Sequence, residues 1–206
     1  MKRKRIKLYK VISVIIAVCI VLNSIFFLPV DDIFSEKADA IAYDFDTSGF
    51  TEYDAGAGLN KAIIQIAAAG SEDHFGKGRI ILDKDYTENI EIPDNTAVEI
   101  DLNGHTISPS GDNARSNILV YGMLKLTDNS GEKNGALVSD GTTDISGIKV
   151  LSGGKLVFKG GTIRNYYSSR NGAGILVEEN GFMSFNGGIV ENCNSELTGG
   201  AGFLNE

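Results

Sequence analysis

The stretches KGGTIRN, residues 159–165, and NGGIVEN, residues 186–192, are nearly alike and lie 27 residues apart. In both, an apolar residue and then an asparagine follow a Gly-Gly pair at matched distances. A repeat of this length, with short strands and glycine bends, is too small to bury an apolar face alone and must stack on its neighbours. We therefore interpret each copy as one coil of a solenoid, with the Gly-Gly pair at the same bend of successive coils.

The strands of this solenoid are predicted by an alternation that both copies share. When residues 147–173 are aligned with residues 174–201, five pairs of alternate positions are apolar in both: Ile148 with Ile175, Val150 with Val177, Leu156 with Met183, Phe158 with Phe185, and Ile163 with Val190. The positions between them vary in polarity and charge. Because successive side chains of a strand point to opposite faces, the pattern predicts one buried and one exposed face. Asn165 and Asn192 would then stack at ~4.8 Å, where amides can form a ladder.

Fainter copies of the pattern precede these coils. Residues 96–108 and 117–130 show the same apolar alternation, and the loop-like stretches 109–116 and 139–147 lie between the strands. Before all of them, residues 57–70 place Leu59, Ile63 and Ile66 on one helical face, with Gly70 as the stop. We expect this helix to cap the first coil.

The first forty residues predict export. A basic start is followed by an apolar run from residue 11 to residue 30, and the small residues Ala38 and Ala40 then form a cleavage motif. The segment 1–40 is either a cleaved signal peptide or a retained anchor, since twenty apolar residues can also span a bilayer of ~30 Å. Residues 41–54 are interpreted as a solvated linker, and we expect a secreted or cell-surface protein that meets the membrane only through this apolar segment.

The net charge and the cysteine content indicate which partners and which disulfide bonds can be expected. Residues 1–40 hold seven of the 19 basic and four of the 27 acidic residues, so the remaining 166 residues carry a net charge of −11. This argues against nucleic acid and anionic lipid as partners. Cys193 is the one cysteine beyond the leader, so the exported part forms no internal disulfide. We expect Cys193 to be a buried apolar group.

Residues 55–206 carry a family resemblance. The predicted capping helix, GRIILDKDY (78–86), VEIDLNGHTIS (98–108) and the Gly-Gly coils resemble the right-handed parallel β-helix of the pectate-lyase-like superfamily, and most closely the large exported β-helix proteins of bacterial cell surfaces. The resemblance implies an all-β, right-handed parallel β-helix with a short N-terminal capping helix. Since a third copy begins at residue 201 and stops, we expect an N-terminal fragment whose β-helix is incomplete at its C-terminus.

The resemblance is specific for architecture and not for activity, because its motifs are turn and core residues. Polysaccharide lyases of this superfamily use calcium with an arginine or lysine base, and its hydrolases use clustered aspartates. Glu91, Glu99 and Asp101 are predicted to point outward, but Arg164 and Arg170 lie two or more coils later. We therefore interpret these residues as a solvated face and predict no catalytic residue.

Metal binding has weak support in the sequence. His74 and His105 lack the ligand spacing of a zinc site. Asp44, Asp46, Ser48 and Gly49 fit the first half of a calcium loop, but Ala55 stands where a bidentate glutamate is needed. We predict no metal site, and calcium is the one cofactor whose pattern is present in part.

A ligand patch is suggested by an aromatic pair. Tyr166 and Tyr167, with Arg170 at a loop, could contact a polysaccharide or another cell-surface ligand. In the competing interpretation, one tyrosine packs inward where Cys193 stands in the next copy. Our hypothesis is a non-catalytic cell-surface β-helix segment for adhesion, display or weak glycan binding. The alternative is the N-terminal part of a polysaccharide lyase or glycoside hydrolase whose active site lies beyond residue 206.

Overall fold

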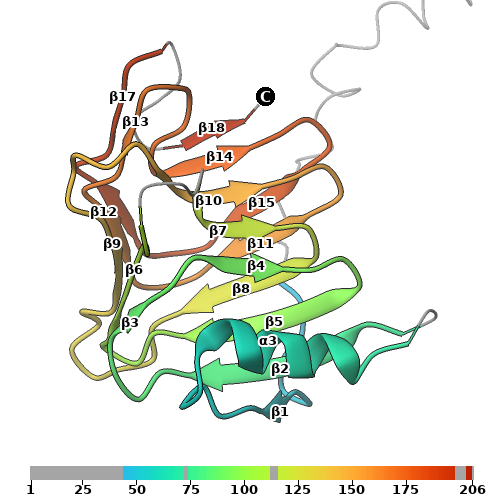
Figure 1. The fold of residues 1–206 in the computed structure, drawn as a ribbon. Coiled ribbons are helices and arrows are strands. Elements are labelled where there is room, and N and C mark those ends of the chain that lie inside the picture. Colours follow the sequence, from blue (N-terminus) through green and yellow to red (C-terminus); the bar gives the residue numbers. More distant parts are fainter. Residues whose placement is uncertain (1–43, 72–73, 112–115, 198–202, 206) are drawn as a thin grey trace, which may run out of the picture. The chain divides into compact units, whose positions relative to one another are not determined.

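The computed structural model describes residues 44–71, 74–111, 116–197 and 203–205 (Figure 1). The predicted leader, with Ala38 and Ala40, lies outside these residues. No described helix is long and apolar enough to cross a bilayer. The elements are one helix, α3 (Leu59–Ala68), and the strands β1 (Thr51–Glu52), β2 (Gly76–Ile81), β3 (Tyr86–Thr87), β4 (Ile90–Ile92), β5 (Thr96–Asp101), β6 (Thr106–Ser108), β7 (Ser116–Val120), β8 (Met123–Thr127), β9 (Ala136–Val138), β10 (Ser146–Val150), β11 (Lys155–Phe158), β12 (Thr162–Arg164), β13 (Tyr167–Ser168), β14 (Ile175–Val177), β15 (Phe182–Phe185), β16 (Ile189–Glu191), β17 (Asn194–Ser195) and β18 (Phe203–Asn205).

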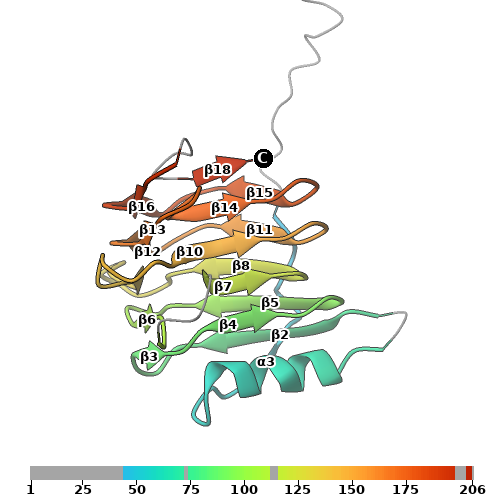
Figure 2. The ribbon, with the colours of Figure 1, turned by 45° about the horizontal axis from the view of Figure 1, so that its top comes forward.

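The strands form stacked parallel sheets (Figures 1 and 2). The first sheet has the order β1-β2-β5-β8-β11-β15, the second β4-β7-β10-β14-β18 and the third β3-β6-β9-β12-β16, and β13 and β17 form a short pair. The chain visits the first, third and second sheets in turn and then starts again one level higher. This is a parallel β-solenoid of about five turns with one short helix, which confirms the predicted fold class.

The register confirms the alignment of the two repeats. All five predicted apolar pairs are Cα partners in neighbouring strands. Ile148, Phe158 and Ile175 are fully buried, as expected. Phe185 is 45% exposed, so its predicted burial is wrong. Its ring packs edge-to-face on Phe158 at 5.2 Å, and β15 is the last strand of the first sheet among the described residues.

The glycine corners stack as predicted. Gly161 and Gly188 have φ of 88° and 86°, in the left-handed region that glycine adopts without strain, and the amide of Ile189 donates to the carbonyl of Gly161 at 3.0 Å. Asn165 and Asn192 also have positive φ, which asparagine tolerates better than most residues. Backbone conformation therefore explains both residue types at this corner, and the predicted amide ladder stays a prediction.

The helix α3 caps the first turn as predicted. It packs against β2 and β4 and buries Leu59, Ala62, Ile63 and Ile66. Its N-cap residue, Gly58, offers no side chain, and the carboxylate of Glu88 takes this role from 29 residues away. Glu88 Oε1 accepts from the amide of Leu59 at 3.0 Å, and Oε2 accepts from the amide of Asn60 at 3.2 Å. A negative charge at this end also complements the helix dipole.

Replacing Glu88 with glutamine should lower the free energy of unfolding by about 1 kcal/mol, because two helix amides lose a charged acceptor. Urea denaturation followed by circular dichroism measures the change. Glu91→Gln is the matched control, since Glu91 is exposed and lies on the next strand. Equal stability of the two variants would show that Glu88 does not cap the helix.

Alanine at Gly161 should be more destabilising than alanine at Gly153. Both have positive φ, so both substitutions carry the strain of ~1–2 kcal/mol that an L side chain meets there. At Gly161 the added Cβ would also lie 2.4 Å from Leu102 Cδ1, whereas at Gly153 it meets nothing within 4 Å. Thermal melts of both variants give the comparison, and a smaller loss for Gly161→Ala would contradict the close packing at the glycine corner.

Candidate functional site

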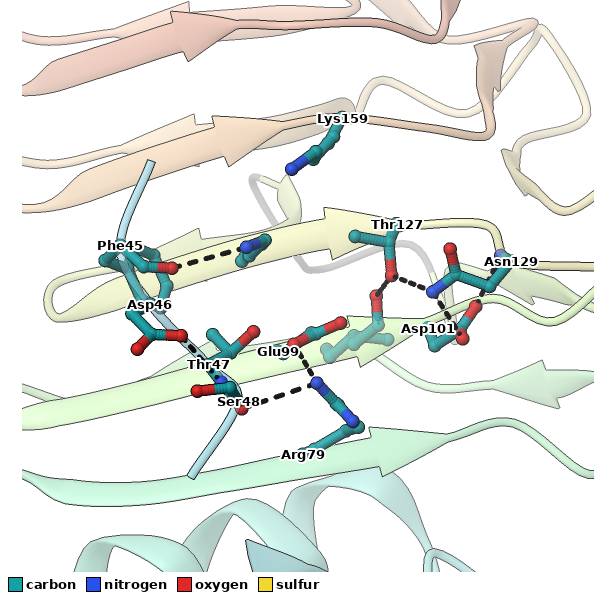
Figure 3. A network of polar contacts seen from close by, with 12 residues as sticks. Phe45, Asp46, Thr47, Ser48, Arg79, Glu99, Asp101, Thr127, Asn129 and Lys159 are labelled. Atoms are coloured by element: carbon teal, nitrogen blue, oxygen red, sulfur yellow. Dashed lines mark hydrogen bonds and ion pairs between the residues drawn. The ribbon is translucent and has the colours of Figure 1, made fainter. Parts of the chain in front are cut away.

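Residues 44–50, which we name the strap, lie across the outer face of the first sheet. Figure 3 shows this segment running across the strands of the sheet. Thr47 is buried, and its carbonyl accepts from Arg79 Nη2 at 3.4 Å. The carbonyl of Phe45 accepts from Lys125 Nζ at 3.3 Å. The strap therefore contacts the sheet through Thr47 and its carbonyl groups, while Asp46, Ser48 and Gly49 are exposed to solvent.

Asp44 anchors the strap to two turns of the solenoid at once. Its Oδ1 lies 2.7 Å from Lys125 Nζ, and its Oδ2 lies 2.7 Å from Lys159 Nζ. Burial alone would raise the pKa of the Asp44 carboxyl, but the two ammonium groups outweigh this and hold the pKa below its usual value. Lys125 is almost completely buried, with 9% of its side chain exposed, whereas Lys159 is 48% exposed.

Beneath the strap, charges alternate from strand to strand. Arg79, Glu99 and Lys125 are successive Cα partners on β2, β5 and β8. Arg79 Nη2 donates to Glu99 Oε2 at 2.9 Å, and only 5% of the Glu99 side chain is exposed. Opposite charges on neighbouring strands stabilise a sheet, and here the strap shields them from water. Glu99 points outward as predicted but is buried, and the solvated-face interpretation is wrong for it.

Two further carboxylates next to this ladder hold the loop after β8. Asp101 is buried and accepts from the amides of Asn103 and Asn129 and from the Asn129 side chain, at 2.9 to 3.0 Å (Figure 3). Asp128 accepts from three backbone amides, those of Gly104, Ser130 and Gly135. Burial would raise the pKa of Asp128, but these hydrogen bonds lower it below its usual value.

A groove of about 890 Å³ lies beside the strap. Its lining includes residues of the strap, the loop after β8 and the glycine corners at Gly160, Gly161 and Gly188. Its ionisable side chains number four acids and four bases: Asp44, Asp46, Glu99, Asp128, Arg79, Lys125, Lys133 and Lys159. Their formal charges cancel. Each of the four carboxylates accepts a hydrogen bond or ion pair from the protein itself.

The structure does not bring all three predicted ligand residues to one surface. Tyr166 is 1% exposed, its hydroxyl donates to Asn117 Oδ1 at 2.6 Å, and Cys193 is buried in the same cluster. One tyrosine thus packs inward toward Cys193, as the competing interpretation held, and its ring does not reach the surface. Tyr167 is half-buried and donates to Glu196, and Arg170 is exposed on the same loop. Of the three predicted residues, Tyr167 and Arg170 are the two that reach the surface.

The cations that lie beside the buried acids could not be identified from the sequence. Glu99 is partnered by Arg79 and Lys125, from the turns before and after it, rather than by Arg164 or Arg170. The partner positions lie 20 and 26 residues away, so the uneven turn length hides the pairing in the sequence.

Residues 44–49, whose partial match to a calcium loop does not predict a metal site, are part of the strap. Asp44 is bound by lysines, and Asp46 Oδ1 accepts from the amide of Ser48 at 2.9 Å. In the part of the chain that the structure describes, no group of three His, Cys, Asp or Glu residues is placed to hold a metal ion.

Replacing Asp44 with asparagine should destabilise the protein by about 1 kcal/mol at pH 7 in low salt, since a partly buried carboxylate between two ammonium groups is lost. A carboxyl whose folded pKa is lowered stabilises the fold above its unfolded pKa of about 3.8, and the effect is lost as pH falls through the folded pKa. The difference in unfolding free energy between wild type and variant should therefore shrink below pH 4. Urea denaturation at several pH values tests this, with Glu52→Gln at an exposed site as control.

Comparison with known proteins does not assign the chain to a family. No family model matches the chain. No curated protein and no solved structure matches it either.

Proposed function

We propose that this chain belongs to an exported cell-surface protein and that its β-solenoid is a non-catalytic scaffold for adhesion or display. The proposal is supported by the leader pattern of residues 1–40, the acidic remainder, and the resemblance of the turn and core residues to exported bacterial β-helix proteins. A solenoid suits this role because its inner positions fix the fold, while its outer positions and loops vary freely.

The observation that carries the proposal is the state of the carboxylates at the groove. Glycoside hydrolysis needs two carboxyl groups ~5–10 Å apart that are available to bind and exchange protons. Here Asp44 is held by two lysines, Glu99 by Arg79, Asp128 by three amides and Asp46 by Ser48. The bonds of Asp44 fasten the strap to the sheet, those of Asp128 hold the loops after β5 and β8, and that of Asp46 lies within the strap. The acids thus act as structural groups, and the groove offers no unengaged carboxylate among the described residues.

Ligand contact in this proposal falls to the loops. Tyr167 and Arg170 lie on the turn that leads through β13, and Ser169 of the same turn is held by Asp144, which accepts from its amide at 2.8 Å. An aromatic ring beside a guanidinium can stack on a sugar face and donate to its hydroxyls. Two such residues make a small contact area, so we propose weak binding of neutral glycans at this patch.

Two measurements on the whole chain test the proposal. We expect no release of unsaturated uronates or reducing ends from polysaccharides, with or without calcium. Affinity electrophoresis in gels that contain neutral polysaccharides should show weak retardation that Tyr167→Ala or Arg170→Ala abolishes. Tyr121→Ala is the matched control, because Tyr121 is an exposed aromatic residue elsewhere on the solenoid. Robust polysaccharide cleavage would overturn the non-catalytic assignment, and equal retardation of all variants would exclude this patch.

A further inference from the structure

Lys125 and Lys159 together form a binding site for one carboxylate. Lys125 lies on β8 and Lys159 follows β11, which is the next strand of the first sheet. Each ammonium group binds a different oxygen of Asp44 at 2.7 Å. Glu99, the acid nearest in register to Lys125, is already paired with Arg79. Since an unpaired buried cation is costly, this face requires an anion, and in this structure the strap provides it.

The strap is recognised largely through its side chains and carbonyl groups. It crosses the strands, so Asp44, Phe45 and Thr47 belong to no β-ladder. Besides the carboxylate, Lys125 lies 5.9 Å from the centre of the Phe45 ring and donates to the Phe45 carbonyl. Arg79 donates to the Thr47 carbonyl. These contacts define a short recognition pattern: an acid, an aromatic residue directly after it, and a carbonyl two residues further on.

The site is open to a competitor from one side. Lys159 is 48% exposed although it holds Asp44, and the groove of about 890 Å³ runs along the strap at this point. An incoming carboxylate can therefore contact Lys159 before the strap leaves. The strap has an advantage over any free ligand because it is tethered, which gives it an effective concentration on the order of millimolar.

We propose that Arg79, Lys125 and Lys159 form a docking site for an extended acidic peptide in which an aspartate is followed by an aromatic residue, and that the strap is its built-in occupant. Such a peptide from another protein binds when it outcompetes the strap or when the strap is displaced. The site supplies fixed cations and a shaped groove, so it selects the peptide by carboxylate and ring rather than by strand pairing. This inference concerns the strap face and does not depend on surface display.

The test uses the whole chain with Asp44→Ala, which removes the carboxylate and keeps the site. The probe is a fluorescent peptide with the sequence of residues 42–49, AYDFDTSG. Fluorescence anisotropy should show saturable binding to the variant and binding weaker by about tenfold or more to wild type, whose strap competes. Adding Lys125→Gln to the variant should abolish binding. Lys77→Gln is the matched control, because Lys77 is exposed on the outer face of the same sheet.

A second probe, AYNFDTSG, replaces the anchoring aspartate with asparagine and should not bind. Absence of binding to the folded variant, or equal binding of both peptides, would overturn the proposal. Circular dichroism shows whether Asp44→Ala folds; if it does not, Asp44→Asn, which keeps the shape of the side chain, takes its place in the same assay. A concentration-dependent wild-type dimer that Asp44→Asn abolishes would also overturn it, because the partner would then be the strap of a second copy.

Discussion

The whole structure depends on the stacking of apolar side chains between successive turns. No single turn can cover its own inner row, so each row is buried by the turns above and below it. Phe158 and Phe185 show this directly: they are partners on neighbouring strands, yet Phe158 is fully buried between two turns while Phe185, on the last described strand of the first sheet, is 45% exposed. At the opposite end, the helix α3 provides the missing layer with its apolar face. The extent to which a side chain is buried in this fold therefore depends on its position along the stack as much as on its residue type.

The strap adds a type of contact that stacking does not provide. Strand pairing joins each turn to its immediate neighbours, whereas Asp44 contacts Lys125 and Lys159, which are 81 and 115 residues away in sequence, and the same short segment then reaches Arg79 on β2. The strap thus contacts three levels of the first sheet, those of β2, β8 and β11, and spans the level of β5 between them. In doing so it joins a row of charged side chains on the outer face into a partly buried network, in which each of Asp44, Glu99, Asp101 and Asp128 has a cationic or amide partner.

The sequence was sufficient for the repeating part of the fold and insufficient for the strap. The five apolar pairs could be predicted because the alternation sets the face and the Gly-Gly pairs set the register. The ladder of Arg79, Glu99 and Lys125 could not, because the turns before the clear repeats differ in length. The ion pairs of Asp44 could not be predicted either, since an aspartate in a polar stretch resembles any solvated residue until its distant lysines are placed. Tyr166 was predictable in part. Its alignment with the region of Cys193 suggested an inward ring, but its hydrogen bond to Asn117 could not be predicted, because only the fold brings these two residues together.

The strap also has a consequence for the order of folding. Asp44 is synthesised before almost all of the solenoid, yet its anchor is complete only when the turn that contains Lys159 has formed. Contacts between residues so far apart in sequence form slowly, because a long loop must close before they are gained. The turns can therefore assemble one upon another while residues 44–50 are still unattached, and a segment made before the solenoid is among the last to reach its native position.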